Sequence, residues 1–174
     1  MFNLFYFIFL FSGNPPVEAP GTFQALSTRI VEYSSKKDFA SFSNLAPGPE
    51  EWKAYDPEQV KGLTEEEIKL KIASGNLPRL KRQFDEVQDD ARSRGVRMKD
   101  ISFNTVKMQR FSDDPNQAVK LEILFYYEHM SGRLSVQAAE INHHWYLLDF
   151  KQEESPFKDI RVTGGNSLLK NLGM

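Results

Sequence analysis

Two adjacent histidines, His143 and His144, are the residues whose types and spacing first suggest chemistry in this sequence. Imidazole nitrogens bind zinc and exchange protons near neutral pH. The third histidine of the chain, His129, falls near the turn at the other end of the intervening predicted strand. Eight or nine strand residues at about 3.3 Å each would separate the two turns by roughly 25 Å. We therefore interpret Asn142-His143 as a type I′ hairpin turn and keep a metal or acid–base site as the alternative.

Aromatic residues and one carboxylate form a second group of candidates. Tyrosine and tryptophan side chains in the predicted strands could line a wall around an apolar ligand, although such side chains also fill protein cores. The carboxylate of Asp149 could act as a general base if it faced a cavity. The candidate ligand-binding residues are Tyr126, Trp145, Tyr146 and Asp149. We assign no catalytic residue and no metal ligand.

Asp113 and Asp114, which precede Pro115, are neighbouring carboxylates that could bind calcium. The alternating ligands and the closing glutamate of an EF-hand loop are missing, so we expect a solvated turn instead. The sequence also lacks the phosphate-loop, Rossmann, HExxH and GxSxG patterns. We therefore expect no cofactor.

The composition narrows the classes of partner. Twenty-two Lys and Arg residues face 24 Asp and Glu residues, and the formal net charge is −2. Such a balance gives no electrostatic footprint for nucleic acid or for an anionic membrane. The chain has no cysteine, which excludes disulfides, thiol catalysis and cysteine-bound zinc. With 40% hydrophobic residues the chain can bury a sizeable core.

The N-terminus suggests export. Residues 2–11 are apolar except for Asn3 and carry no charge. This stretch is shorter than the roughly 20 residues of a membrane-spanning helix and suits the apolar region of a signal peptide. It lacks an early Lys or Arg and a clear A-x-A cleavage site, so an uncleaved anchor and a buried element or misplaced start remain alternatives. We expect residues 1–20 to lie outside the domain, an extracytoplasmic location (periplasmic or secreted), and membrane contact only through an uncleaved N-terminal segment.

Helical spacing dominates the first half of the domain. The first predicted helix carries apolar residues at intervals of three and four: Phe23, Leu26, Ile30 and Tyr33. A second helix begins at Thr64, whose side chain can form a capping box with Glu67. We expect Gly75 to end this helix in the left-handed conformation. Pro78 then begins a further helix, which Gly95 ends.

The second half changes to a two-residue period, which is typical of strands. Residues 101–111 form the first predicted strand, and the second has one apolar face: Val119, Leu121, Ile123, Phe125 and Tyr127. We expect residues 130–132 to form the turn to a third strand, and residues 144–151 to form the fourth. The sequence therefore predicts an α+β fold, with N-terminal helices packed on one face of a four-stranded antiparallel meander.

The segment from Ile101 to Lys151 resembles the sheet of small NTF2-like or cystatin-like extracytoplasmic proteins. Those chains commonly have N-G-K before W-Y-L-hydrophobic-D, where this chain has N-H-H before W-Y-L-L-D at residues 142–149. The segment from Phe23 to Phe42, with KKDFASF, is similar to their opening helix. The resemblance implies a cone-shaped domain over residues 21–152, in which a strongly curved sheet wraps a long helix, followed by a C-terminal tail at 153–174.

The expected function is that of a non-catalytic exported binding domain, for a small apolar ligand or a protein partner at the mouth of the curved sheet. The resemblance also implies an alternative, a cavity enzyme of the ketosteroid-isomerase or dehydratase type with Asp149 as its base. A structural module of a cell-envelope assembly is a second alternative. A filled interior favours an interaction role, whereas an empty cavity with polar groups favours ligand capture or chemistry.

Overall fold

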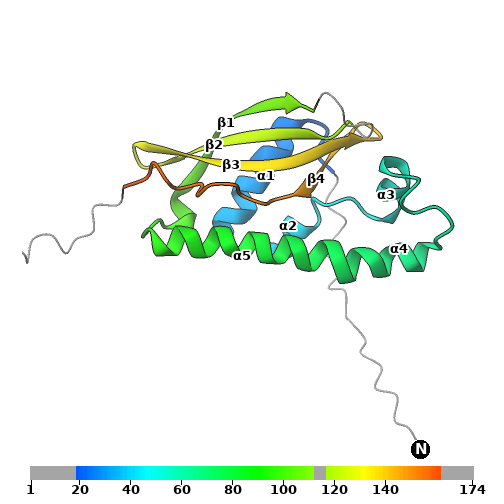
Figure 1. Ribbon diagram of the computed structural model, residues 1–174. Helices are drawn as coiled ribbons and strands as arrows, with labels where there is room; N and C mark the ends of the chain where they lie inside the picture. Colours follow the sequence, from blue (N-terminus) through cyan, green and yellow to red (C-terminus); the bar gives the residue numbers. More distant parts are fainter. Residues whose placement is uncertain (1–18, 112–116, 162–174) are drawn as a thin grey trace, which may run out of the picture.

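The structure, a computed structural model, describes residues 19–111 and 117–161. Helices come first along the chain and an antiparallel sheet in the order β1-β2-β3-β4 comes last (Figure 1). The helices are α1 (Phe23–Lys36), α2 (Phe39–Ser43), α3 (Pro49–Tyr55), α4 (Glu65–Lys71) and α5 (Leu77–Ser93), and a short 3₁₀ turn, η2, spans Met98–Asp100. The strands are β1 (Ile101–Arg110), β2 (Val119–Tyr127), β3 (Met130–Ile141) and β4 (His144–Asp149). The expected α+β fold class is confirmed.

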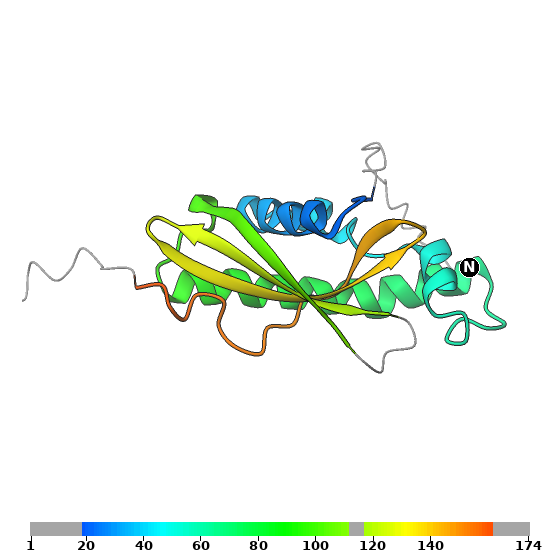
Figure 2. The same cartoon turned by 90° about the horizontal axis from the view of Figure 1, so that it is seen from above.

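One face of the sheet packs on the main core, and the other face is open to solvent except over the β3–β4 hairpin. Along β2, Leu121, Ile123 and Phe125 are fully buried against the helices, while the residues between them face outward. Helix α1 packs on the strands, and α5 runs along the same side of the sheet (Figure 1). The strands twist markedly (Figure 2), but the strong curvature expected from the sequence is only weakly developed.

The caps predicted for the helices are present. The hydroxyl of Thr64 accepts a hydrogen bond from the Glu67 N–H at 3.3 Å, and the Glu67 carboxylate accepts one from the Thr64 N–H at 2.7 Å. Gly95 has φ of 72° and ends α5, with the Val96 N–H donating to the Ala91 carbonyl at 2.9 Å. This 6→1 bond is the signature of a Schellman cap, which a left-handed glycine permits.

The expected helix end at Gly75 is wrong. A π-helical turn, η1 (Ile72–Asn76), joins α4 to α5, so the two run on as one rod (Figure 1). Pro78 has no N–H, and its ring would clash with the carbonyl four residues back in a regular α-helix. The π turn relieves this conflict by widening the backbone, with the Leu77 N–H donating to the carbonyl of Ile72.

The turn between β2 and β3 comes earlier than predicted. It consists of Glu128 and His129, with φ of 54° at Glu128, and β3 already begins at Met130. Gly132, expected in the turn, instead lies within β3 opposite Phe125. A Cβ on Gly132 would lie 2.1 Å from the Phe125 ring and 2.7 Å from the Pro156 carbonyl oxygen. Glycine is therefore needed here because other groups approach closely, and not because the chain turns.

Residues 150–161 form a segment that we call the strap, which crosses below the free part of β3 (Figure 1). Residues 153–161 of the strap fall in the predicted C-terminal tail, yet Phe157 and Ile160 are buried in the main core. The Phe157 ring meets the Phe125 ring edge-on, with centroids 5.5 Å apart. The strap thus closes the core from the side that β4, which is shorter than β3, leaves open. The loop at 112–116, with Asp113 and Asp114, and residues 162–174 lie outside the described residues.

Replacing Gly132 with alanine is expected to lower the free energy of unfolding by about 1–3 kcal/mol, because the new methyl group overlaps the Phe125 ring. Urea unfolding of the purified domain measures this change. Gly75→Ala is the matched control, since a Cβ there meets no atom within 4 Å. It should stabilise the helix, by up to about 1 kcal/mol. Equal effects of the two substitutions would contradict the close approach at Gly132.

Candidate functional site

The histidine pair forms a hairpin tip, as predicted. Asn142 and His143 have φ of 52° and 66°, which are the two positive values of a type I′ turn, and they join β3 directly to β4. The His143 side chain is 99% exposed. His129 lies in the turn at the opposite end of β3. Within residues 19–111 and 117–161, no group of three or more His, Asp or Glu residues is arranged to hold a metal ion.

His143→Gly is expected to raise the free energy of unfolding by about 1 kcal/mol, because glycine adopts the left-handed conformation without the strain of a Cβ. His144→Gly, one residue further and inside β4, should lower it by roughly 0.5–1 kcal/mol. Thermal or urea unfolding measures whether each substitution raises or lowers the free energy of unfolding. A zinc-dependent rise in the wild-type melting temperature that disappears in His143→Gly would instead support the metal alternative.

The aromatic candidates do not lie around one cavity. Trp145 packs in the main core, edge-on to the Phe23 ring with centroids 5.7 Å apart. Its neighbour Tyr146 points to the opposite face of β4, as adjacent strand residues must. Tyr126 is 47% exposed on the outer face of β2. Ligand binding by these residues therefore remains a prediction, without a shared pocket to support it.

Tyr146 belongs to a second, smaller core on the other face of the β3–β4 hairpin. Helix α3, which the sequence analysis did not predict, covers this face with Trp52 and Tyr55. The Tyr146 hydroxyl donates a hydrogen bond of 3.4 Å to the Glu51 carboxylate. Burial, and then the negative charge of Glu51, raise the pKa of Tyr146 above its usual value. The hydroxyl therefore stays protonated at neutral pH and serves as a hydrogen-bond donor that holds α3 on the sheet.

Asp149 ends β4 beside helix α5. Its carboxylate accepts a hydrogen bond of 2.8 Å from the Gln83 side-chain amide and lies 3.6 Å from the Arg79 guanidinium. The Gln83 carbonyl oxygen accepts a hydrogen bond from the Phe150 N–H at 3.1 Å, and Arg79 donates to the Leu148 carbonyl at 3.1 Å. Two side chains of α5 therefore clamp the end of β4 at the point where the strap begins.

Gln83→Ala is expected to lower the free energy of unfolding by about 1–3 kcal/mol, because it leaves the buried N–H of Phe150 without its acceptor. Gln24→Ala, at an exposed position of α1, is the matched control and should change stability by less than about 0.5 kcal/mol. The shift in urea midpoint measures both. A Gln83→Ala protein as stable as the control would show that the clamp contributes nothing.

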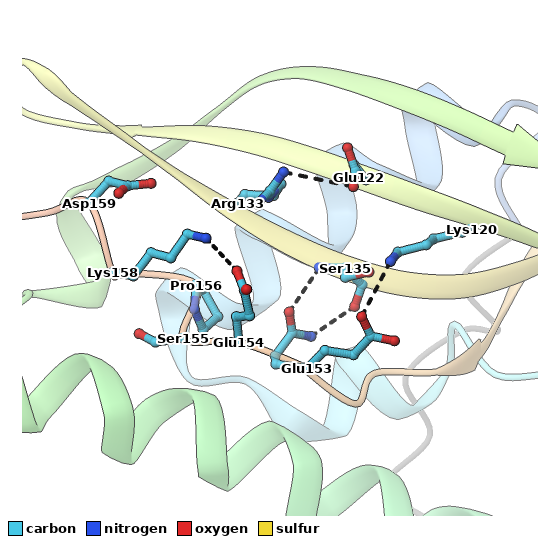
Figure 3. Close-up of a pocket in the computed structure, with 11 residues that line it drawn as sticks. Lys120, Glu122, Arg133, Ser135, Glu153, Glu154, Ser155, Pro156, Lys158 and Asp159 are labelled. Carbon is cyan, nitrogen blue, oxygen red and sulfur yellow. Dashed lines mark hydrogen bonds and ion pairs between the residues drawn. The ribbon is translucent and has the colours of Figure 1, made fainter.

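Three recesses surround the strap. Their volumes are about 80, 210 and 270 Å³, below the roughly 300–1,000 Å³ of pockets that enclose drug-sized ligands. The first is lined mainly by charged side chains from the outer sheet face and the strap (Figure 3). These charges pair with one another: Lys120 with Glu153, Arg133 with Glu122, and Lys158 with Glu154.

The most consequential residue that sequence reasoning missed is Gln152. Its side-chain amide accepts a hydrogen bond from the Ser135 N–H at 2.8 Å and donates one to the Ser135 carbonyl at 2.8 Å. The Pro156 carbonyl accepts from the Arg133 N–H at 3.0 Å. These bonds satisfy the edge of β3 beyond the end of β4. The spacing of Phe157 and Ile160 after Pro156 was a usable signal that this segment is buried, whereas nothing local marks Gln152.

No protein-family model matches the sequence, and no curated protein matches it significantly. A solved structure described as a cystatin-like protein from Ruminococcus gnavus ATCC 29149 aligns with a TM-score of 0.47 and 12% identity, over 79% of this chain. The chain spans 42% of the length of that protein. The fold is established by the strand order and register given above. In the described part of the chain, no helix is both long and apolar enough to span a membrane.

Proposed function

We propose that this chain is a non-catalytic extracytoplasmic domain that binds a protein partner through the exposed side of its sheet. The observation that carries the proposal is the filled interior between helices and sheet. The Phe42 ring lies 4.8 Å from the Phe84 ring and 4.9 Å from the Phe150 ring, measured between centroids. Aromatic rings thus occupy the volume in which a cone-shaped member of this fold would hold a ligand.

The small-ligand and enzyme alternatives lack comparable support. The recesses at the strap are smaller than pockets that enclose drug-sized ligands, and the first is lined mainly by charged side chains that pair with one another. Among the described residues, the partners of Asp149 are Gln83 and Arg79, whereas the isomerase alternative needs a tyrosine hydroxyl beside this carboxylate. A protein partner needs no cavity, because it can bind an open surface.

The exposed apolar residues support a binding surface on the sheet. Three of the five large hydrophobic side chains that are exposed among the described residues belong to the sheet or follow it directly: Met108 on β1, opposite Leu121 on the inner face, Phe111 just after β1, and Tyr126 on the outer face of β2. Their exposed fractions are 37%, 39% and 47%. Aromatic residues and methionine are enriched in protein interfaces relative to other surface.

A photo-crosslinking amino acid placed at Tyr126 or Phe111 is expected to capture a protein of defined mass in cells that make the chain, because these positions face the proposed partner. The same amino acid at Leu70, which is 68% exposed on α4, is the matched control and should not capture it. Gel electrophoresis and mass spectrometry of the adducts provide the measurement. Identical adducts from all three positions, or adducts from Leu70 alone, would contradict the proposal.

A thermal-shift screen with lipids and steroids complements this experiment. A bound ligand at 100 times its dissociation constant would stabilise the domain by about 2.7 kcal/mol. Such a shift, without crosslinked protein, would favour the small-ligand alternative. Fractionation of the same cells tests the location: the full chain should leave the cytoplasm, and a chain without residues 1–20 should stay there.

A further inference from the structure

Strand β1 is the edge of the sheet that the rest of the fold leaves open. At the other edge, the N–H groups of Trp145 and Leu147 in β4 donate to the carbonyls of Pro20 and Leu45 at 2.7 and 2.8 Å. In the part of β3 beyond β4, the N–H of Arg133 and both backbone groups of Ser135 form hydrogen bonds with the strap. Within the described ranges, the backbone of residues 102–110 bonds to β2 and to no other segment. Unpaired backbone groups on an edge strand are a template for another extended chain.

The second half of β1 is exposed on both faces. Five consecutive residues, 107–111, are exposed. Successive side chains of a strand point to opposite faces, so neither the helices nor another layer covers this end of the strand. Among the described residues, Lys107 and Arg110 form no ion pair, whereas many other cations of the domain pair with a neighbour within one turn of helix. Within residues 19–111 and 117–161, the open edge therefore carries two cations without a counterion.

We propose that the outer edge of β1 binds an acidic, extended segment of a partner protein as a fifth strand of the sheet. This inference rests on the proposed function and specifies the partner's chemistry and its mode of binding. Main-chain hydrogen bonds to the edge supply affinity in such strand addition, and side chains that alternate across the pleat supply specificity. Antiparallel pairing extends the pattern of the existing sheet and is slightly more stable per residue.

The register of the edge predicts the sequence of the partner. Cross-strand neighbours lie about 4.5–5.5 Å apart and interact directly. In an antiparallel partner, carboxylates opposite Arg110 and Lys107 lie three residues apart, with an apolar residue opposite Met108 between them. The recognised pattern is therefore acidic, any residue, apolar, acidic. A β-branched apolar residue opposite Met108 extends the apolar surface that Leu121 begins on the inner face.

A second copy of this chain fits the same edge poorly. Pairing two β1 edges would bring together two strands that each carry Lys107 and Arg110. Like charges on neighbouring strands destabilise a sheet, and lysine on an edge strand is a known means of preventing self-association. Lys107 and Arg110 repel the basic β1 strand of a second copy and attract an acidic strand. The charge on the incoming strand therefore distinguishes the two occupants.

The test uses the full chain and an acetylated, amidated heptapeptide, Thr-Glu-Thr-Val-Glu-Val-Thr. At millimolar peptide, saturable NMR shifts are expected at the amides of residues 106–110. Lys107→Glu/Arg110→Glu should weaken binding about tenfold, because it reverses both charge pairs, and should instead bind the peptide with Lys in place of Glu. Lys61→Glu/Arg82→Glu, an equal charge change at exposed helix-side positions, is the control and should bind like wild type.

Backbone pairing is tested by N-methylating alternate residues of the peptide on the edge that faces β1. This change removes main-chain donors and keeps every charge, so binding should fall at least about tenfold. Equal binding of the methylated peptide, an equal loss in the control variant, no saturable shift in wild type, or dimerisation through β1 would each overturn the proposal. If crosslinking at Tyr126 succeeds while the peptide fails, the proposed function stands and strand addition is wrong; if crosslinking also fails, both are wrong.

Discussion

The strands of the sheet do not supply hydrogen-bond partners for all of its backbone N–H and carbonyl groups. The structure depends on other segments that supply the missing partners. β4 is half as long as β3, with six residues against twelve, so part of β3 has no neighbouring strand. An unpaired N–H or carbonyl costs about 1–3 kcal/mol when it is buried. Glutamine side chains resolve this problem, because a primary amide carries the same donor and acceptor as a peptide group. Gln152 takes the place of a strand beside Ser135, and Gln83 takes the place of one at Phe150.

The hydrogen bonds at the edge of β3 and the packing of the core depend on the same segment, the strap. The strap must lie against β3 for Gln152 to reach Ser135, and the same segment inserts Phe157 between sheet and helices. Gly132 allows the approach by leaving room for the Phe125 ring and the Pro156 carbonyl. The strap therefore closes the core on the side of the sheet that the shorter β4 leaves open.

Local patterns in the sequence predicted local structure well. The alternation in β2, the capping box at Thr64, the Schellman glycine and the type I′ turn at Asn142 each depend on residues within a few positions of one another, and each is present. Features that depend on distant residues could not be predicted in this way. The burial of the strap, the role of Gln152 and the need for Gly132 arise from contacts between residues 7 to 32 positions apart in the chain. The candidate site was least predictable. Its aromatic residues were grouped by type, but Trp145 and Tyr146 lie on opposite faces of β4, and Tyr126 lies at the far end of β2.

The π turn at η1 changes the direction in which the side chains of α5 point around the helix axis relative to those of α4. Each residue of an α-helix advances the side chains by about 100°. Twelve residues separate Ile68 from Leu80, so a regular helix would place these two side chains roughly 120° apart. A π turn takes up one surplus residue, which brings the difference down to about 20°. Both side chains are buried, so this single extra residue keeps Ile68 and Leu80 on the same side of the rod, across a proline that would otherwise have ended the helix.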